Sequence, residues 1–274
     1  VRGHANLKRF LVNSPKRVLV TNDDGIDSPG VAALAAMVAE AGFVPVVAAP
    51  AINWSGAAAA LGPLDDPSRV TVRRVELPGL EDWEISAVEA PPALIVMLAM
   101  LGGFGDLPDL VVSGVNQGPN TGRSTLHSAT VAAALVAAKF ERSALAVSLG
   151  DGADDHHGLW RWETATQMAA PLLQWLPEAP AKTVLNLNVP NIEHHQVLGL
   201  HHCDLAPVGG VHTSIVGRDE HGIDIDLLPT SGEIPHGTDS AWLRKGYATV
   251  TALAPPSAQV TDLPVEGWHG LAGV

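Results

Sequence analysis

The sequence of 274 residues contains one cysteine, Cys203, and only 16 basic residues against 29 acidic ones, which gives a formal net charge of -13. A single cysteine excludes a framework of intrachain disulfides and is typical of a reducing compartment, so we expect a cytoplasmic protein. A negative field of this size repels nucleic-acid polymers, and no cluster of Lys or Arg reverses it locally. The composition therefore argues against nucleic-acid binding. A small anionic substrate remains compatible with it only where a cation or backbone amides invert the local field.

Long apolar segments are also absent. The longest, 93–101, is far too short to cross a bilayer, so we expect no membrane partner. Residues 1–15 are mixed and partly basic, and they lack the apolar core of a signal peptide, so we interpret them as a short flexible leader. Aromatic residues make up 4% of a chain that is 46% hydrophobic, so the core must consist mainly of Ala, Val and Leu.

The first half of the chain alternates short apolar segments with Ala-rich segments of helical length. The predicted strands span 18–21, 44–48, 70–77, 84–88, 109–113, 144–149, 184–189 and 247–253. The predicted helices begin at Ser28-Pro29, at Pro91-Pro92, at Ser128 and at Trp160. Short apolar strands separated by helices indicate an α/β fold, with a mostly parallel sheet covered on both faces.

The domain organisation follows from where this alternation ends. We expect a core over 16–191 that carries the metal and phosphate sites, with a polar loop at 151–158. A C-terminal segment over 192–274 completes the chain and includes the returning strand. The part from 192 to about 238 is rich in His, Gly, Asp and Pro and has little periodicity. Its irregularity makes it a candidate for a protruding arm that mediates oligomer contacts.

The first predicted strand runs directly into two adjacent carboxylates, Asp23 and Asp24, and then Gly25. Neighbouring side chains of a strand point to opposite faces, so both acids reach one target only if the chain turns, which Gly25 permits. Two carboxylates held so close repel each other unless a cation lies between them, and a hard divalent ion is the simplest such cation. The competing interpretation is that the pair only caps the next helix.

Polar residues follow three predicted strands at their carboxyl ends, where open parallel sheets bind ligands. These segments are 22–25, 53–56 and 114–122. Two Asp carboxylates, a Ser hydroxyl and an Asn carbonyl form an all-oxygen donor set that suits Mg²⁺ or Mn²⁺. Ser128 and Thr130 stand at the start of the Ala-rich helix, a position that suits phosphate. A metal ion beside a phosphate cradle favours hydrolysis of a phosphate ester by metal-activated water.

Segment 18–30, Val-Leu-Val-Thr-Asn-Asp-Asp-Gly-Ile-Asp-Ser-Pro-Gly, closely resembles the opening motif of the SurE family of survival-protein nucleotidases. The resemblance continues through 46–50, 55–56, 108–120, 128–134, 145–149, 184–190, 237–240 and 246–251. It implies a Rossmann-like, doubly wound sheet and a C-terminal arm. It also implies one divalent metal ion per subunit, 5′/3′-nucleoside monophosphate phosphatase activity, and a homodimer or homotetramer.

Position by position, the resemblance implies that Asp23, Asp24, Ser55 and Asn116 are the metal ligands, the same four residues that the loop argument selects. Asp23 and Asp24 are also the predicted catalytic residues, and one of them would accept the proton of the attacking water. The predicted phosphate contacts are Asn120, Ser128 and Thr130, with His127 as a further candidate contact or general acid. The competing interpretation of His127 is an ordinary polar loop residue.

The sequence departs from the family pattern in its substrate-facing loops. An acidic residue and a basic stretch usually follow Pro50, but here 51–54 reads Ala-Ile-Asn-Trp. Segment 57–60 is four alanines where polar residues are usual, and Ala129 replaces a glycine. These departures leave open an alternative function, a metal- or nucleotide-binding regulatory protein with little or no turnover. A dinucleotide-binding Rossmann enzyme and a zinc site built from histidines fit less well. No Gly-x-Gly-x-x-Gly follows the first strand, and the histidine doublets lie in polar surroundings typical of solvated loops.

Overall fold

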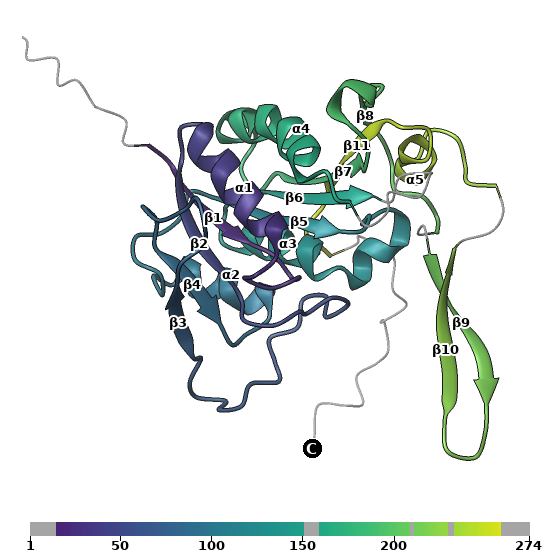
Figure 1. The fold of residues 1–274 in the computed structure, drawn as a ribbon, viewed down its shortest axis with the longest axis horizontal. Coiled ribbons are helices and arrows are strands. Elements are labelled where there is room, and N and C mark those ends of the chain that lie inside the picture. Colours follow the sequence, from purple (N-terminus) through teal and green to yellow (C-terminus); the bar gives the residue numbers. More distant parts are fainter. Residues whose placement is uncertain (1–14, 151–158, 209–210, 230–232, 259–274) are drawn as a thin grey trace, which may run out of the picture.

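In the computed structural model, which describes residues 15–150, 159–208, 211–229 and 233–258, nine strands form one sheet. Its order is β3 (Val72–Val75), β4 (Ile85–Val88), β2 (Val44–Pro50), β1 (Arg17–Thr21), β5 (Leu110–Gln117), β6 (Ser143–Gly150), β7 (Val184–Pro190), β11 (Ala248–Leu253) and β8 (Leu200–His202) (Figure 1). Along the order from β4 to β7, each strand is parallel to the next one in the sheet. β3 is antiparallel to β4, β11 is antiparallel to β7, and β8 is parallel to β11. The mostly parallel α/β sheet predicted from the sequence is confirmed.

Helices cover both faces of this sheet. α1 (Pro29–Glu40) and α4 (Trp162–Trp175) pack into one apolar cluster, and α2 (Pro92–Met100) and α3 (Ala129–Lys139) pack into another. The alternation of a strand divides its side chains between these clusters: Val18 and Val20 of β1 belong to the first, and Leu19 belongs to the second. All three are fully buried, which explains why the strand reads as one continuous apolar run.

α1 begins as its sequence predicts. Ser28 is the N-cap, its Oγ accepts a hydrogen bond of 3.2 Å from the Gly30 amide, and Pro29 occupies the first turn. Gly30 also allows the helix to approach β5 closely, because a Cβ there would lie 2.2 Å from the Val115 carbonyl oxygen. The start of α1 is therefore fixed against the central strand of the site.

The predicted end of β5 was wrong. Glycines and asparagines over 114–122 predict a loop, but β5 continues to Gln117, and its register with β6 shifts between Ser113 and Asn116. Gly114 has a φ of +134°, and a Cβ there would lie 2.2 Å from the Val147 carbonyl oxygen. A glycine in a strand often marks such an irregularity, and here it carries Asn116 to the edge of the sheet where β1 ends.

The irregular segment after residue 192 contains the protruding arm that the sequence predicts, but the two strands of that arm were not predicted. β9 (Val211–Arg218) and β10 (Ile223–Pro229) pair as an antiparallel hairpin outside the main sheet, and Figure 1 shows this hairpin projecting from the body. The short elements η1 (Gly122–His127), η2 (Leu176–Glu178), η3 (His194–Gln196) and α5 (Asp239–Leu243) complete the described fold. The predicted loop 151–158 and residues 1–14 of the predicted leader lie outside the described residues. No helix in the described ranges is long and apolar enough to span a bilayer.

Candidate active site

Asp23 and Asp24 lie in the turn that follows β1. Gly25 has a φ of +103°, which a glycine adopts without strain, and its carbonyl oxygen accepts a hydrogen bond of 2.8 Å from Asn22 Nδ2. The turn is also tied to the loop after β2, because the Trp54 amide donates to the Asp23 carbonyl oxygen at 2.7 Å. The two aspartates therefore sit on a backbone that is held from two sides.

The carboxylate of Asp23 is buried, with 3% of the residue exposed, and it faces the N-terminus of α3. Thr130, in the first turn of α3, donates from Oγ1 to Asp23 Oδ1 at 2.5 Å and from its amide to Oδ2 at 3.2 Å. Free amides and the positive end of the helix dipole both favour a negative charge at this position. The Asp23 carboxylate thus occupies an anion-binding position within the protein itself.

Asp24 connects the other two loops. Its Oδ2 accepts from the Gln117 amide at 3.1 Å, and its Oδ1 accepts from Asn53 Nδ2 at 3.4 Å. Asn53 in turn accepts the Ser55 amide at its Oδ1, at 2.7 Å. One carboxylate therefore brings the end of β5 and the loop after β2 to the end of β1, as the three-loop argument predicts.

Burial destabilises the charged forms of both aspartates. Burial, and after it the negative charge of Asp23, raises the pKa of Asp24 to about 6, against hydrogen bonds from Gln117 and Asn53 that lower it. Burial also raises the pKa of Asp23, despite the hydrogen bonds from Thr130. No Lys or Arg of the described residues lowers either pKa. A cation between the two carboxylates would remove this repulsion.

The donor chemistry of the site fits a hard divalent cation. Asn116 is 9% exposed, and its Nδ2 donates to the Gly118 carbonyl at 2.6 Å, which leaves the amide oxygen as the free end of its side chain. Ser55 is exposed on the neighbouring loop. The described residues contain no group of three or more His, Cys, Asp or Glu placed to hold a metal ion. A cation at this site would therefore be bound by two carboxylates and neutral oxygens, with water completing the shell, which suits Mg²⁺ or Mn²⁺.

Two of the predicted phosphate contacts, Ser128 and Thr130, are buried and bond other parts of the protein, whereas His127 is exposed. Ser128 caps α3, since its Oγ accepts the Val131 amide at 3.1 Å. Thr130 is fully buried and its hydroxyl bonds Asp23, which makes it an orienting group for that carboxylate. His127 is exposed at the end of η1, and its carbonyl oxygen accepts the Ala58 amide at 3.2 Å. Contact of any of these residues with phosphate stays a prediction.

Asn120 belongs to a polar network beneath the site that sequence reasoning missed. Its Nδ2 donates to Ser148 Oγ at 2.8 Å and its amide donates to Asn188 Oδ1 at 2.7 Å. The Nδ2 groups of Asn186 and Asn188 donate back to the Asn120 carbonyl at 2.8 and 3.1 Å. Both β7 asparagines are buried. Two Asn at alternate positions of an otherwise apolar strand are the signal that could have predicted it.

Asp239 at the start of α5 is a second residue that sequence reasoning missed. It is fully buried, and its Oδ2 accepts the Gly122 amide at 2.8 Å while its Oδ1 accepts the Ala206 amide at 2.8 Å. Gly122 also lies against Val208, since a Cβ there would be 2.1 Å from the Val208 carbonyl oxygen. Asp239 therefore holds the loop that follows Asn120 against the chain that leads into the hairpin.

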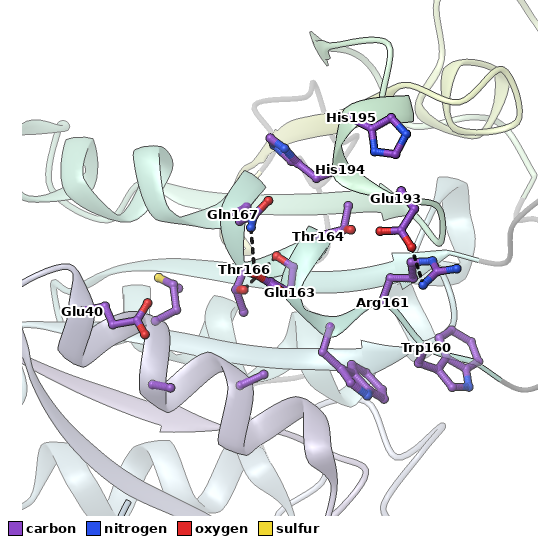
Figure 2. A pocket seen from close by; sticks show the side chains of 14 residues that line it. Glu40, Trp160, Arg161, Glu163, Thr164, Thr166, Gln167, Glu193, His194 and His195 are labelled. Atoms are coloured by element: carbon purple, nitrogen blue, oxygen red, sulfur yellow. Dashed lines mark hydrogen bonds and ion pairs between the residues drawn. The ribbon is translucent and has the colours of Figure 1, made fainter. Parts of the chain in front are cut away.

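A cavity of about 810 Å³ lies between α1 and α4, away from the aspartate pair. Figure 2 shows its side chains, which include Trp160 and Glu40, with Arg161 joined to Glu193 by an ion pair of 2.7 Å. Neither Asp23 nor Asp24 lines it. A smaller cavity of about 380 Å³ lies beside the loop after β2, which carries Asn53 to Asp24. The chemistry of the site is therefore not located in the larger cavity.

Comparison with known proteins places the chain among relatives of one kind. A family model described as "Survival protein SurE" matches residues 18–208. Proteins named "5'-nucleotidase SurE" from Xanthomonas euvesicatoria pv. vesicatoria (strain 85-10) and Xanthomonas campestris pv. campestris (strain 8004) are each 34% identical to the chain over 263 residues. These alignments cover 93% of this chain and 96% of the relative.

The fold has a solved counterpart. The structure titled "Crystal Structure of Sure Protein from Aquifex aeolicus" superposes on the chain with a TM-score of 0.72 at 25% sequence identity. The match covers 89% of this chain and 95% of that one. The resemblance that the sequence motifs indicate therefore extends to the arrangement of the whole sheet and its helices.

Proposed function

The chain belongs to the survival protein SurE family, and from this premise we propose that it is a 5′-nucleotidase, a phosphoric monoester hydrolase that releases phosphate from nucleoside monophosphates. The single observation that carries this proposal is the pair Asp23 and Asp24, two adjacent carboxylates with raised pKa values and no basic partner among the described residues. Such a pair costs stability unless something binds it, and a functional site is where proteins keep such groups.

The proposed ligands of one divalent ion per subunit, Mg²⁺ or Mn²⁺, are Asp23, Asp24, Ser55 and Asn116. When bound, such an ion would polarise a phosphoryl oxygen and lower the pKa of the attacking water. The residues of the chain orient the reacting groups. Thr130 and the first turn of α3 hold the Asp23 carboxylate in place.

The two aspartates also differ in their fitness to accept the proton of the attacking water. Asp24 is the more accessible of the two, so its carboxylate is the one that can face the attacking water. Asp23 is buried, and both of its oxygens are engaged by Thr130. We therefore assign the proton to Asp24 and a binding role to Asp23.

The proposal includes hydrolysis of 3′- as well as 5′-monophosphates.

It also includes assembly into a homodimer or homotetramer through the β9–β10 hairpin. Ile215 and Ile225 are directly opposite each other in that hairpin, and they are 59% and 65% exposed. Two large apolar side chains side by side on a projecting element favour burial against another chain.

The test is a phosphate-release assay on nucleoside 5′- and 3′-monophosphates and on phenyl phosphate, with Mn²⁺, with Mg²⁺ and with a chelator. We expect turnover of the nucleotides that the chelator abolishes and either ion restores. Turnover that the chelator leaves unchanged would contradict the metal dependence. Nucleotide and Mn²⁺ binding in calorimetry without any phosphate release would favour the alternative, a regulatory protein that binds both and turns over neither.

A further inference from the structure

The cavity of about 380 Å³ beside the aspartate pair has walls that the proposed chemistry does not use. Its size falls within the range of small-molecule pockets, roughly 300 to 1,000 Å³. Ile52 and Trp54 form one wall, and the residue between them, Asn53, donates to the Asp24 carboxylate. The Trp54 amide donates to the Asp23 carbonyl. A group bound in this cavity is therefore a direct neighbour of a phosphate held at Asp24.

The lining combines an apolar surface with hydrogen-bond donors that have no partner. Ile52, Trp54 and Leu64 supply the apolar surface. The indole Nε1 of Trp54 is buried and makes no hydrogen bond with any described residue. A buried donor without a partner is costly and uncommon, and this one is covered, so a ligand acceptor reaches it only if the Trp54 ring moves.

Two guanidinium groups and three carboxylates, those of Asp65, Asp66 and Glu89, complete the cavity. Arg69 and Arg73 line it, and within the described ranges neither side chain forms a hydrogen bond or an ion pair. Arg74, the next residue of β3, points to the opposite face of the strand and pairs with Glu84 at 3.1 Å. Glu89 lies in the same cavity as a free acceptor, since only its amide is hydrogen bonded there.

We propose that this cavity binds the base of the nucleoside monophosphate substrate, and that it selects a 6-oxopurine such as guanine. This inference rests on the proposed function and adds a substrate class to it. Arginine binds the O6 and N7 acceptors of guanine in a bidentate manner, and a carboxylate accepts from base amino and imino groups. The Trp54 ring and a guanidinium plane offer surfaces on which a flat base stacks.

The chemistry of adenine fits the same walls less well. Adenine presents an amino donor where guanine presents O6, so the guanidinium groups of Arg69 and Arg73 would meet fewer acceptors. A pyrimidine offers a smaller stacking surface and lacks N7.

The experiment measures hydrolysis of GMP, AMP, UMP and phenyl phosphate by the metal-loaded protein and by three variants. Arg73→Met removes a guanidinium from the cavity, Trp54→Phe removes the indole N–H and keeps an aromatic ring, and Arg74→Met is the matched control. We expect Arg73→Met to lower kcat/KM for GMP by about 10-fold, mainly through KM, and to leave phenyl phosphate unchanged. We expect Trp54→Phe to act in the same direction and Arg74→Met to change neither substrate.

Calorimetry with guanosine, which has no phosphate, separates this inference from the proposed function. Binding of guanosine that Arg73→Met weakens by the same factor and Arg74→Met does not would support the cavity assignment even if no phosphate ester is hydrolysed. Equal kcat/KM for GMP and AMP in the unmodified protein would overturn it. So would a loss in Arg73→Met that is as large for phenyl phosphate as for GMP, or no binding of guanosine.

Discussion

The hydroxyl of Thr130 donates a hydrogen bond of 2.5 Å to the Asp23 carboxylate, although the two residues lie 107 positions apart in the sequence. This bond joins the turn after β1 to the first turn of α3. It orients a carboxylate that burial would otherwise favour in its neutral form. Thr130 is therefore a positioning residue for Asp23.

Replacing Thr130 by valine tests this role, because the side chain keeps its shape and loses its donor. We expect turnover to fall by about 10- to 100-fold, the usual cost of removing a group that orients a metal ligand. Thr130→Ser keeps the hydroxyl and should retain most of the activity. Steady-state kinetics with Mn²⁺ and calorimetric Mn²⁺ affinity measure both effects. Equal activity of the valine and serine variants would contradict the positioning role.

Asp24→Asn should abolish most of the turnover. Since removing a residue that only supports a metal ligand already costs about 10- to 100-fold, removing a proposed ligand and proton acceptor should cost more than that. The amide keeps one oxygen for the Gln117 N–H, so the fold should remain intact. Circular dichroism and phosphate release on the same preparation check the two expectations. Near-normal turnover in a folded variant would remove Asp24 from the site.

The stability of the metal-free protein should depend on the charge of Asp24. Because the pKa is raised, the stabilising contribution of the protonated form is fully present below the ordinary pKa of 3.8 and is lost as the pH rises through about 6. The difference between these two pKa values corresponds to at most ~3 kcal/mol in the free energy of unfolding. Partial solvent contact of Asp24 reduces this contribution to about 1–2 kcal/mol.

Urea unfolding of the metal-free wild type and of Asp24→Asn measures this contribution at both ends of the range. We expect the variant to be more stable than the wild type at about pH 8 and the two to be equal at about pH 4. Added Mn²⁺ should stabilise the wild type at the higher pH and leave the variant nearly unchanged. A variant that is less stable than the metal-free wild type at the higher pH would contradict the assignment of a destabilising charge.

Asp239 should contribute to stability through its bonds to the Gly122 and Ala206 amides. In Asp239→Asn, an NH₂ group faces one of these buried donors, so we expect a loss of about 2–3 kcal/mol. Urea unfolding with the control Asp82→Asn, a change at an exposed carboxylate outside this network, measures the difference. A loss no larger than that of the control would show that the carboxylate does not hold the two segments together.

The hairpin should determine the oligomeric state. Ile225→Lys places a charge beside Ile215, which should weaken burial of that face against another chain. Light scattering coupled to size-exclusion chromatography should show a homodimer or homotetramer for the wild type and a smaller particle for the variant. Lys245→Ala, outside the hairpin, serves as a control. An unchanged mass in Ile225→Lys would remove this face from the interface.

The fold class was predictable because its strongest signals are local. Strands such as β1 and β6 are buried on both faces and therefore have mostly apolar sequences. The N-cap residues Ser28 and Ser128 mark the starts of α1 and α3. The aspartate pair was also visible, because two acids directly after a buried strand contradict its apolar pattern.

The features that were missed depend on contacts that local patterns do not record. Gly114 reads as a turn signal, but it allows β5 to lie close to β6. The hairpin shows little periodicity because most of its described side chains are exposed, so no buried face imposes an alternation. Asp239 bonds Gly122 across 117 positions, a pairing that becomes visible only once the chain is folded.

An anomalous difference map from a crystal soaked with Mn²⁺ tests the central claim most directly. The account predicts one peak per chain within bonding distance of carboxylate oxygens of both Asp23 and Asp24, with Asn116 and Ser55 oxygens at the same ion. A peak elsewhere, for example beside His194 and His195 in the cavity between α1 and α4, or no peak at the aspartates, would contradict it.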